Sequence, residues 1–351
     1  MLSFLGSGTS PRLHSETLTP QQAPAWKIVR RLMLVTSALL LHAMPAQAQA
    51  MRTFVSGQGK DSNACSATAP CQTLQAALAK TLAGGQIYAL DSANYGYVTI
   101  NKAVSIFSGG RVAGVLATSS VSGLTIAAGA NDIVNLQGLD IDGAGSGANG
   151  ILFTSGATIN IQDSVIRGFT NGINFQPSGS SGLFVGSTLI SNNSTGISFQ
   201  NSAVSIGTLN DVQLVNNGSG IVALGSSSTA VAKVTVQSSM VANNTTVGIL
   251  AGSFSAVSVS NTTIANNGAG LEAQSASALL QVSGSTVTGN GTGWMVANGG
   301  QVISSSNNSI GGNASGNSAP PTTPTAPVAN FLTDGAGGYL IDANGGKVTA
   351  L

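Results

Sequence analysis

The sequence predicts an all-β protein that folds as a right-handed parallel β-helix with a short capping α-helix near its N-terminus. Three observations predict this fold class. A unit of 22 to 28 residues recurs along the chain, apolar residues within each unit alternate with a period of two, and Gly or Asn interrupts every few residues. Since 42% of the 351 residues are hydrophobic and only 7% are charged, the chain differs from disordered polypeptides.

Residues 1–50 have the pattern of an export signal with a long leading segment. A positive stretch around Arg30 precedes an apolar run from residue 32 to residue 43, and two overlapping A-x-A cleavage sites end at Ala48 and Ala50. The apolar run is too short to span about 30 Å of hydrocarbon. We therefore expect an exported chain, in the periplasm, on the cell surface or outside the cell, with no membrane span after processing.

The net charge of the processed chain limits which classes of molecule it is expected to bind. Removal of residues 1–50 takes away four of the 12 basic and one of the 11 acidic side chains, together with both histidines, which leaves a net charge of −2. No basic surface remains, so nucleic acid is excluded as an expected partner. The two remaining thiols, Cys65 and Cys71, predict a local disulfide, because a zinc site would need further ligands and no histidine can supply them.

Residues 51–85 are expected to form the N-terminal cap of the solenoid. The segment from Cys71 to Leu82 is amphipathic with helical spacing, and Leu74, Ala77, Leu78 and Leu82 share one side. A solenoid needs such a cap because the unpaired strands of its first coil would otherwise promote aggregation. The disulfide is expected to fix this helix in place.

Residues 86–318 are expected to form the β-helix itself. The most regular marker is a glycine followed by a large apolar residue, and the intervals between markers are 22, 24, 24, 28, 22 and 23 residues. A second marker, an Asn pair, keeps step with it from Asn192-Asn193 onward. The glycines of the first marker are Gly150, Gly172, Gly196, Gly220, Gly248, Gly270 and Gly293.

Each unit has room for three short strands and their turns, so each unit predicts one coil. The Asn pairs are expected at a corner, because Asn tolerates left-handed backbone and stacked Asn side chains can hydrogen-bond between coils. Phe153, Phe175 and Phe199 keep the repeat and are expected to stack in the interior, where alanines replace them in later coils. Residues 319–327 predict a stiff Pro/Thr linker, and residues 328–351 a short C-terminal tail.

Several stretches resemble a group of secreted α-proteobacterial right-handed β-helix repeat proteins with a pectin-lyase-like fold. They read TFVSGQGKDSNACSATAPCQTLQAAL, GGQIYALDSANYGYVTINKAVSI, VNLQGLDIDGAGSGANGI and, near the end, SSSNNSIGGN. The resemblance covers residues 52–318 and is most specific in the cap. It implies the architecture. By analogy, lyases of this fold hold Ca²⁺ at acidic clusters and use an Arg or Lys base, whereas hydrolases use several converging Asp side chains.

One stretch of the processed chain concentrates charged side chains. Asp140, Asp142, Asp163 and Arg167 lie within it, and the alternation around Leu139 directs the first two carboxylates to one outer face. Alignment of GLDIDG with DSVIRG places Arg167 one coil above Asp142. The simpler interpretation is an ion pair between coils. The alternative is a catalytic site, with the three carboxylates holding Ca²⁺ or transferring protons and Arg167 as base or substrate clamp.

Aromatic side chains leave a similar choice. Trp294 breaks the apolar column at the glycine marker, where it is expected to close the last coils, although an exposed indole also suits sugar stacking. Tyr88, Tyr95 and Tyr97 near the cap carry the same two interpretations.

The sequence therefore favours a non-catalytic exported solenoid that presents Ser, Thr and Asn side chains to a polysaccharide or cell-surface glycan, with no cofactor expected. The alternative is a polysaccharide lyase or glycoside hydrolase of pectin-lyase-like fold, with Asp140, Asp142, Asp163 and Arg167 as its catalytic candidates and Ca²⁺ as the cofactor if it is a lyase.

Overall fold

The structure is a computed structural model that describes residues 49–322. Residues 1–48 of the predicted export signal lie outside the described residues. Residues 323–351, which include part of the predicted linker and the whole predicted tail, lie outside them as well. In the part of the chain that is described, no helix is long and apolar enough to cross a membrane.

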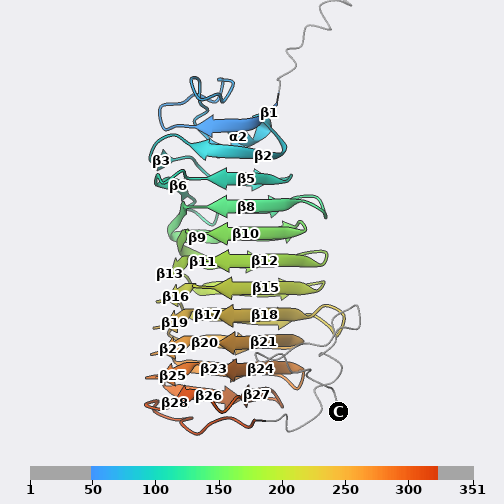
Figure 1. The fold of residues 1–351 in the computed structure, drawn as a ribbon, viewed down its shortest axis with the longest axis vertical. Coiled ribbons are helices and arrows are strands. Elements are labelled where there is room, and N and C mark those ends of the chain that lie inside the picture. Colours follow the sequence, from blue (N-terminus) through green and yellow to red (C-terminus); the bar gives the residue numbers. More distant parts are fainter. Residues whose placement is uncertain (1–48, 323–351) are drawn as a thin grey trace, which may run out of the picture. The chain divides into compact units, whose positions relative to one another are not determined.

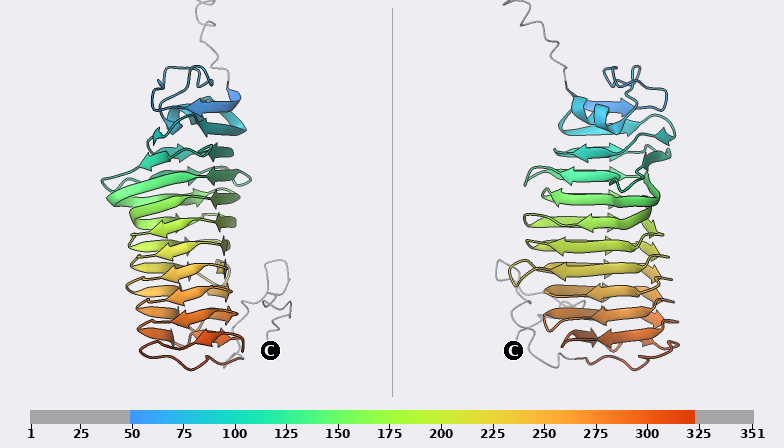
Figure 2. Two further views of the ribbon diagram at one scale, coloured as in Figure 1. Left: turned by 60° about the vertical axis from the view of Figure 1, so that its left-hand side comes forward. Right: turned by 180° about the vertical axis from the view of Figure 1, so that it is seen from behind.

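The described chain is a right-handed parallel β-helix, which confirms the predicted fold class. Its coils follow one another along a single axis, and all but the terminal coils have strands on three faces (Figures 1 and 2). The strands on one face form a sheet of 11 strands. In order they are β1 (Ala50–Val55), β2 (Thr81–Ala89), β5 (Val104–Phe107), β8 (Ile133–Gln137), β10 (Thr158–Gln162), β12 (Ser181–Gly186), β15 (Ser205–Asn210), β18 (Ala232–Gln237), β21 (Ser255–Ser260), β24 (Ala278–Ser283) and β27 (Gln301–Ser304).

The other two faces are built from shorter strands, and two long strands turn the corner between them. The second face runs through β3 (Ala93–Asn94), β6 (Ala113–Leu116), the first parts of β9 (Leu139–Ser155) and β11 (Val165–Phe175), β13 (Leu189–Ser191), β16 (Gln213–Val215), β19 (Met240–Ala242), β22 (Thr263–Ala265), β25 (Thr286–Thr288) and β28 (Ser309–Ile310). The third runs through β4 (Val98–Ile100), β7 (Leu124–Ala127), the second parts of β9 and β11, β14 (Thr195–Asn201), β17 (Ser219–Gly225), β20 (Val247–Ala251), β23 (Ala269–Ala273) and β26 (Thr292–Val296).

The interior is filled by columns of identical or similar side chains in register. Ile151 pairs with Ile173, which pairs with Ile197, so the glycine marker identified a true interior column. The predicted phenylalanine stack is also confirmed: the ring centroids of Phe153 and Phe175 are 4.6 Å apart, and those of Phe175 and Phe199 are 5.7 Å apart.

The stack ends at Phe199, and the next coils carry alanine in its column. Gly207 on the facing strand β15 makes room for the last ring, because a Cβ atom there would lie 2.4 Å from Cζ of Phe199. Alanine therefore takes over the phenylalanine column in the later coils, as the sequence predicted.

The Asn pairs occupy a corner, as predicted, and their two members do different things. The first Asn of each pair takes the left-handed conformation, with φ of 56°, 58°, 57° and 56° at Asn192, Asn216, Asn243 and Asn266. The second is buried and hydrogen-bonds the same residue one coil on, in a ladder that begins at Asn193. The ladder continues through Asn217, Asn244, Asn267, Asn290 and Asn313.

The N-terminal cap contains the predicted disulfide and helix, with different helix bounds. Cys65 and Cys71 are bonded. Helix α2 (Leu74–Lys80) packs against β1, β2 and β4, and Thr73 caps it by accepting a hydrogen bond from the N–H of Ala76. The prediction of a helix from residue 71 to residue 82 was too long at both ends.

The C-terminal error of that prediction has a local cause. Strand β2 begins at Thr81, whose hydroxyl lies 2.8 Å from that of Thr53 on β1, so the chain leaves the helix directly into the sheet. Leu82 consequently lies outside the apolar side of the helix and is exposed. Strand β1 also belongs to the 11-stranded sheet, which therefore begins before the cap helix and not at residue 86.

Candidate functional site

The charged cluster predicted from the sequence lies on the second face, where β9 and β11 run side by side. Ile141 pairs with Ile166, and Asp142 with Arg167, which confirms the predicted register. Leu139 and Ile141 are buried, so Asp140 and Asp142 project outward between them. The local alternation of the sequence therefore brings both carboxylates to the guanidinium group of the next coil.

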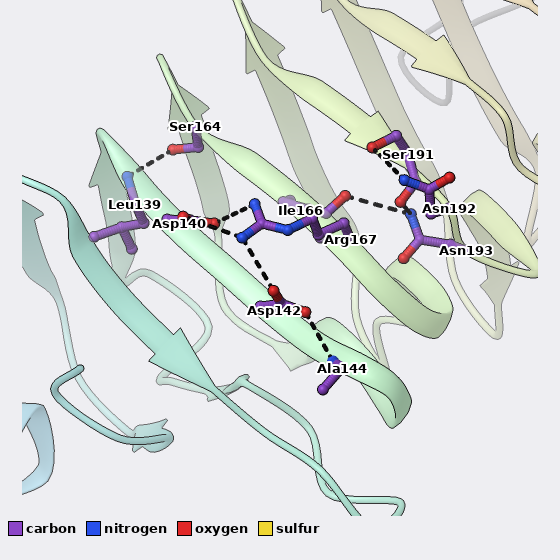
Figure 3. Close-up of polar contacts among 10 residues, drawn as sticks. All are labelled: Leu139, Asp140, Asp142, Ala144, Ser164, Ile166, Arg167, Ser191, Asn192 and Asn193. Carbon is purple, nitrogen blue, oxygen red and sulfur yellow. Dashed lines mark hydrogen bonds and ion pairs between the residues drawn. The ribbon is translucent and has the colours of Figure 1, made fainter. Parts of the chain in front are cut away.

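Arg167 binds both carboxylates at once (Figure 3). Its Nη1 lies 2.5 Å from Oδ1 of Asp140, and its Nη2 lies 3.0 Å from Oδ2 of Asp142. The hydrogen bond that Arg167 donates to Asp140 is the main reason why the pKa of Arg167 is raised above its ordinary value. A guanidinium that holds its proton more tightly is a poor general base, so the geometry favours the ion-pair interpretation.

Asp163, the fourth residue of the predicted site, does not take part in this ion-pair cluster. It occupies the turn between β10 and β11 with a left-handed φ of 52°, and its Oδ2 accepts a hydrogen bond of 2.9 Å from Nε2 of Gln137. Within residues 49–322, no three Asp, Glu, His or Cys side chains are grouped so that they could hold a metal ion. The three carboxylates predicted to bind Ca²⁺ are thus not brought to one point.

Replacing Asp142 by alanine is expected to lower the free energy of unfolding by about 1 kcal/mol or less, because its side chain and that of Arg167 are 34% and 35% exposed. The change also removes the hydrogen bond that the N–H of Ala144 donates to Oδ1 of Asp142. Urea unfolding followed by circular dichroism measures the effect. A loss of several kcal/mol would mean that the pair holds the two coils together far more strongly than its exposure implies.

Tyr95 and Trp294 pack against the interior of the solenoid, whereas Tyr88 and Tyr97 are at least partly accessible to solvent. Tyr95 is buried and donates a hydrogen bond of 2.7 Å to Oδ1 of Asp91, and burial is the main cause that raises the pKa of Tyr95. Trp294 pairs with Leu271, packs against the core and donates through Nε1 to the carbonyl oxygen of Ser318 at 2.6 Å. Tyr97 is exposed and Tyr88 half-buried.

A groove of about 510 Å³ lies on the outer face of the 11-stranded sheet, away from the charged cluster. It crosses β18, β21 and β24, and hydroxyl and amide side chains alternate there with the buried valines beneath. The sequence showed the alternation but not the groove, because lining residues that are neighbours on adjacent strands are 23 positions apart and are of common types. The polar lining comprises Lys233, Thr235, Gln237, Ser258, Ser260, Asn261, Gln281, Ser283 and Asn307.

Comparison with known proteins bears on the fold. A family model described as right handed beta helix region matches residues 149–314, and no curated protein sequence matches the chain. Among solved structures, the chain is similar to pectate lyase Pel9A, at 14% identity and a TM-score of 0.52, over 87% of this chain and 89% of that one.

Two further solved structures are similar at a TM-score of 0.40. The A-module of the Azotobacter vinelandii mannuronan C-5 epimerase AlgE6 is 14% identical over 65% of this chain and 80% of that one. A rhamnogalacturonan lyase is 12% identical over 85% of this chain and 96% of that one. At such identities the likeness extends to the course of the backbone and does not carry over an active site.

Proposed function

Starting from a right-handed parallel β-helix of pectate-lyase-like fold, we propose that this chain is an exported, non-catalytic protein that binds a polysaccharide along the outer face of its 11-stranded sheet. The observation that carries the proposal is the chemistry of that face. Its outward side chains are mostly hydroxyls and amides, and they follow one another in register from coil to coil. The disulfide of the cap supports the export part of the proposal, since such bonds persist in oxidising compartments.

The outward residues at the centre of each strand form a row along this face, called here the middle row, and this row is nearly uncharged. On the N-terminal side, Nδ2 of Asn160 donates to Oδ1 of Asn135 at 2.7 Å, and Nδ2 of Asn135 donates to Oγ of Ser105 at 2.9 Å. The row then passes Phe184 on β12 and continues on the C-terminal side through Thr208, Thr235, Ser258 and Gln281. Rows of groups that both donate and accept suit a ligand whose own groups are hydroxyls.

The groove gives this row a concave segment. Ser258 stands at its centre, between Thr235 and Gln281 in register, and a volume of about 510 Å³ lies within the range of small-ligand sites. The hydroxyl and amide groups can exchange hydrogen bonds with water for hydrogen bonds with sugar hydroxyls. Because each exchange gains little, affinity must come from many contacts along an extended chain.

The charged cluster supports a non-catalytic role. Both carboxylates are engaged by Arg167, and the raised pKa of that guanidinium opposes its use as a base. The charged cluster lies on the second face of the solenoid, whereas the groove lies on the 11-stranded sheet. In this proposal the cluster joins two coils and takes no part in chemistry.

The proposal is tested by exposing residues 51–351 to a panel of immobilised polysaccharides that includes glucan, mannan, galactan, polygalacturonate and alginate. Replacing Ser258 by tyrosine fills the groove at an outward position and is expected to lower binding at least tenfold, since each lost 1.4 kcal/mol is a factor of about ten. Thr125→Tyr is the matched control, because Thr125 lies half-buried on the third face. Absence of binding to every member of the panel would overturn the proposal.

The enzymatic alternative is tested on the same panel. The polyuronates are incubated with the protein with and without Ca²⁺, and formation of unsaturated products is followed by absorbance. We expect no cleavage by the protein or by Asp142→Ala. Calcium-dependent cleavage that the substitution abolishes would replace the binding role by a lyase.

A further inference from the structure

A ladder of aromatic rings stands on the outer face of the sheet at its N-terminal end. Phe54, Tyr88 and Phe107 occupy the same position on β1, β2 and β5. The ring centroids of Phe54 and Tyr88 are 6.2 Å apart, and those of Tyr88 and Phe107 are 5.0 Å apart with an angle of 27° between the planes. All three side chains are half-buried, whereas Ile87 and Ile106 beside them point into the core.

A cation lies over the middle ring of the ladder, and the ladder ends at Phe107. The guanidinium group of Arg52 lies 5.1 Å from the centroid of the Tyr88 ring and donates to Oε1 of Gln86. Beyond Phe107 the next residue in the row is Gln137 on β8, which is followed by Gln162 and then Gly186. Phe107 is thus the last ring, and it faces a position that no aromatic side chain fills.

A cavity of about 690 Å³ opens at this end of the ladder. Its walls are the two rings of Tyr88 and Phe107, the turn of residues 108–111, Gln137 and Asp163. The turn is held by hydrogen bonds to Ser108: its Oγ accepts from the N–H of Gly110, and its carbonyl oxygen accepts from the N–H of Arg111. Gly138 lets the turn approach β8, because a Cβ atom there would lie 2.1 Å from Oγ of Ser108.

The polar groups of the cavity are balanced in charge. Arg111 provides one cation and Asp163 one anion, and the amide of Gln137 donates to the Asp163 carboxylate at 2.9 Å. An aromatic face beside an amide and a carboxylate offers stacking for the C–H face of a sugar ring together with hydrogen bonds for its hydroxyls. A site without net charge gives no preference to a uronate.

We infer that this cavity is a second subsite, in which a neutral sugar ring stacks on Phe107, and that one polysaccharide chain occupies it together with the groove. The inference rests on the proposed function, since both sites lie on the same face of the sheet. From β8, which lines the cavity, to β18, which lines the groove, there are four strand spacings along β10, β12 and β15. At ~4.8 Å each, the two sites are separated by about 19 Å.

Two weak sites on one rigid face make binding depend on chain length. A saccharide too short to bridge about 19 Å engages one site at a time, whereas a longer chain binds the second site at a high effective concentration. The affinity of the protein for neutral oligosaccharides should therefore rise steeply, by roughly a hundredfold, once the chain spans both sites.

Isothermal titration tests this with gluco- and manno-oligosaccharides of increasing length, and with oligogalacturonates as the anionic class. Phe107→Ala is expected to remove the steep rise and leave the affinity for short chains in the groove unchanged, while Phe107→Trp retains the rise. Gln137→Ala provides a variant that keeps both rings and is expected to weaken long-chain binding. Tyr97→Ala is the matched control, because Tyr97 is an exposed aromatic residue that lies outside the 11-stranded sheet and lines neither site.

The outcomes separate this inference from the proposed function. If Ser258→Tyr abolishes binding but Phe107→Ala and Gln137→Ala bind long chains as tightly as the unchanged protein, the second subsite is refuted and the proposed function stands. A preference for oligogalacturonates over both neutral series would refute the neutral ligand. If no saccharide binds the unchanged protein, both proposals fail.

Discussion

Replacing Phe175 by alanine is expected to lower the free energy of unfolding by about 3–5 kcal/mol. The ring is fully buried between Phe153, at 4.6 Å, and Phe199, at 5.7 Å, so its removal costs both transfer free energy and contacts with two neighbours. The coils above and below are held by parallel strand pairing and cannot collapse into the space. Urea unfolding of the two proteins, followed by far-ultraviolet circular dichroism, measures the difference.

Phe184→Ala serves as the control for this prediction. Phe184 lies on β12 with its ring on the outer face of the sheet, where 45% of it is exposed. The same chemical change should there cost less than about 1 kcal/mol. Equal losses at the two positions would show that the rings of Phe153, Phe175 and Phe199 do not form a packed interior.

The interior of the solenoid was predictable because its signals repeat. Ile151, Ile173 and Ile197 each follow a glycine at nearly constant spacing, and the structure places them in one column. The Asn marker was equally reliable, since the corner demands left-handed backbone in one residue and a buried amide in the next. When one physical requirement recurs in every coil, chance matches in a single coil do not obscure it.

A second corner was missed because different residue types satisfy it. A left-handed residue also directly follows seven strands of the 11-stranded sheet, from β8 to β24, and the coils use Gly, Asp, Ser or Asn for it. This explains Asp163, which was grouped with Asp140 and Asp142 from sequence proximity. The residues at this corner are Gly138, Asp163, Ser187, Asp211, Ser238, Asn261 and Gly284.

The candidate binding surfaces were harder to predict than the charged cluster. Asp140, Asp142 and Arg167 could be brought together from one register, because a single pairing of neighbouring coils relates them. The groove depends on which side chains of β18, β21 and β24 are small. The aromatic ladder depends on the first three strands of the sheet, β1, β2 and β5, whose spacing in the sequence is irregular. Without a constant period, Phe54, Tyr88 and Phe107 cannot be aligned from the sequence.

Replacing Asn244 by alanine is expected to lower the free energy of unfolding by about 3–5 kcal/mol, because it breaks the buried Asn ladder in the middle. Oδ1 of Asn244 accepts from the backbone N–H of Asn217 at 3.0 Å and from its Nδ2 at 3.2 Å. Nδ2 of Asn244 donates to Oδ1 of Asn267 at 2.8 Å and to the carbonyl oxygen of Leu214 at 3.1 Å. Alanine therefore removes side-chain hydrogen bonds to both neighbouring coils, and Asn244 itself is fully buried, so water cannot readily replace the amide.

Asn210→Ala distinguishes the ladder from a general effect of losing an Asn side chain. Asn210 ends strand β15 on the exposed outer side of the same solenoid, and its replacement should change the free energy of unfolding by less than about 0.5 kcal/mol. Amide hydrogen exchange adds a spatial test: Asn244→Ala should lower protection at Asn217, whose N–H donates to the lost oxygen, more than at distant Asn313. If protection fell equally along the coils, or if both variants unfolded at the same urea concentration, the buried amides would not be what fixes this corner.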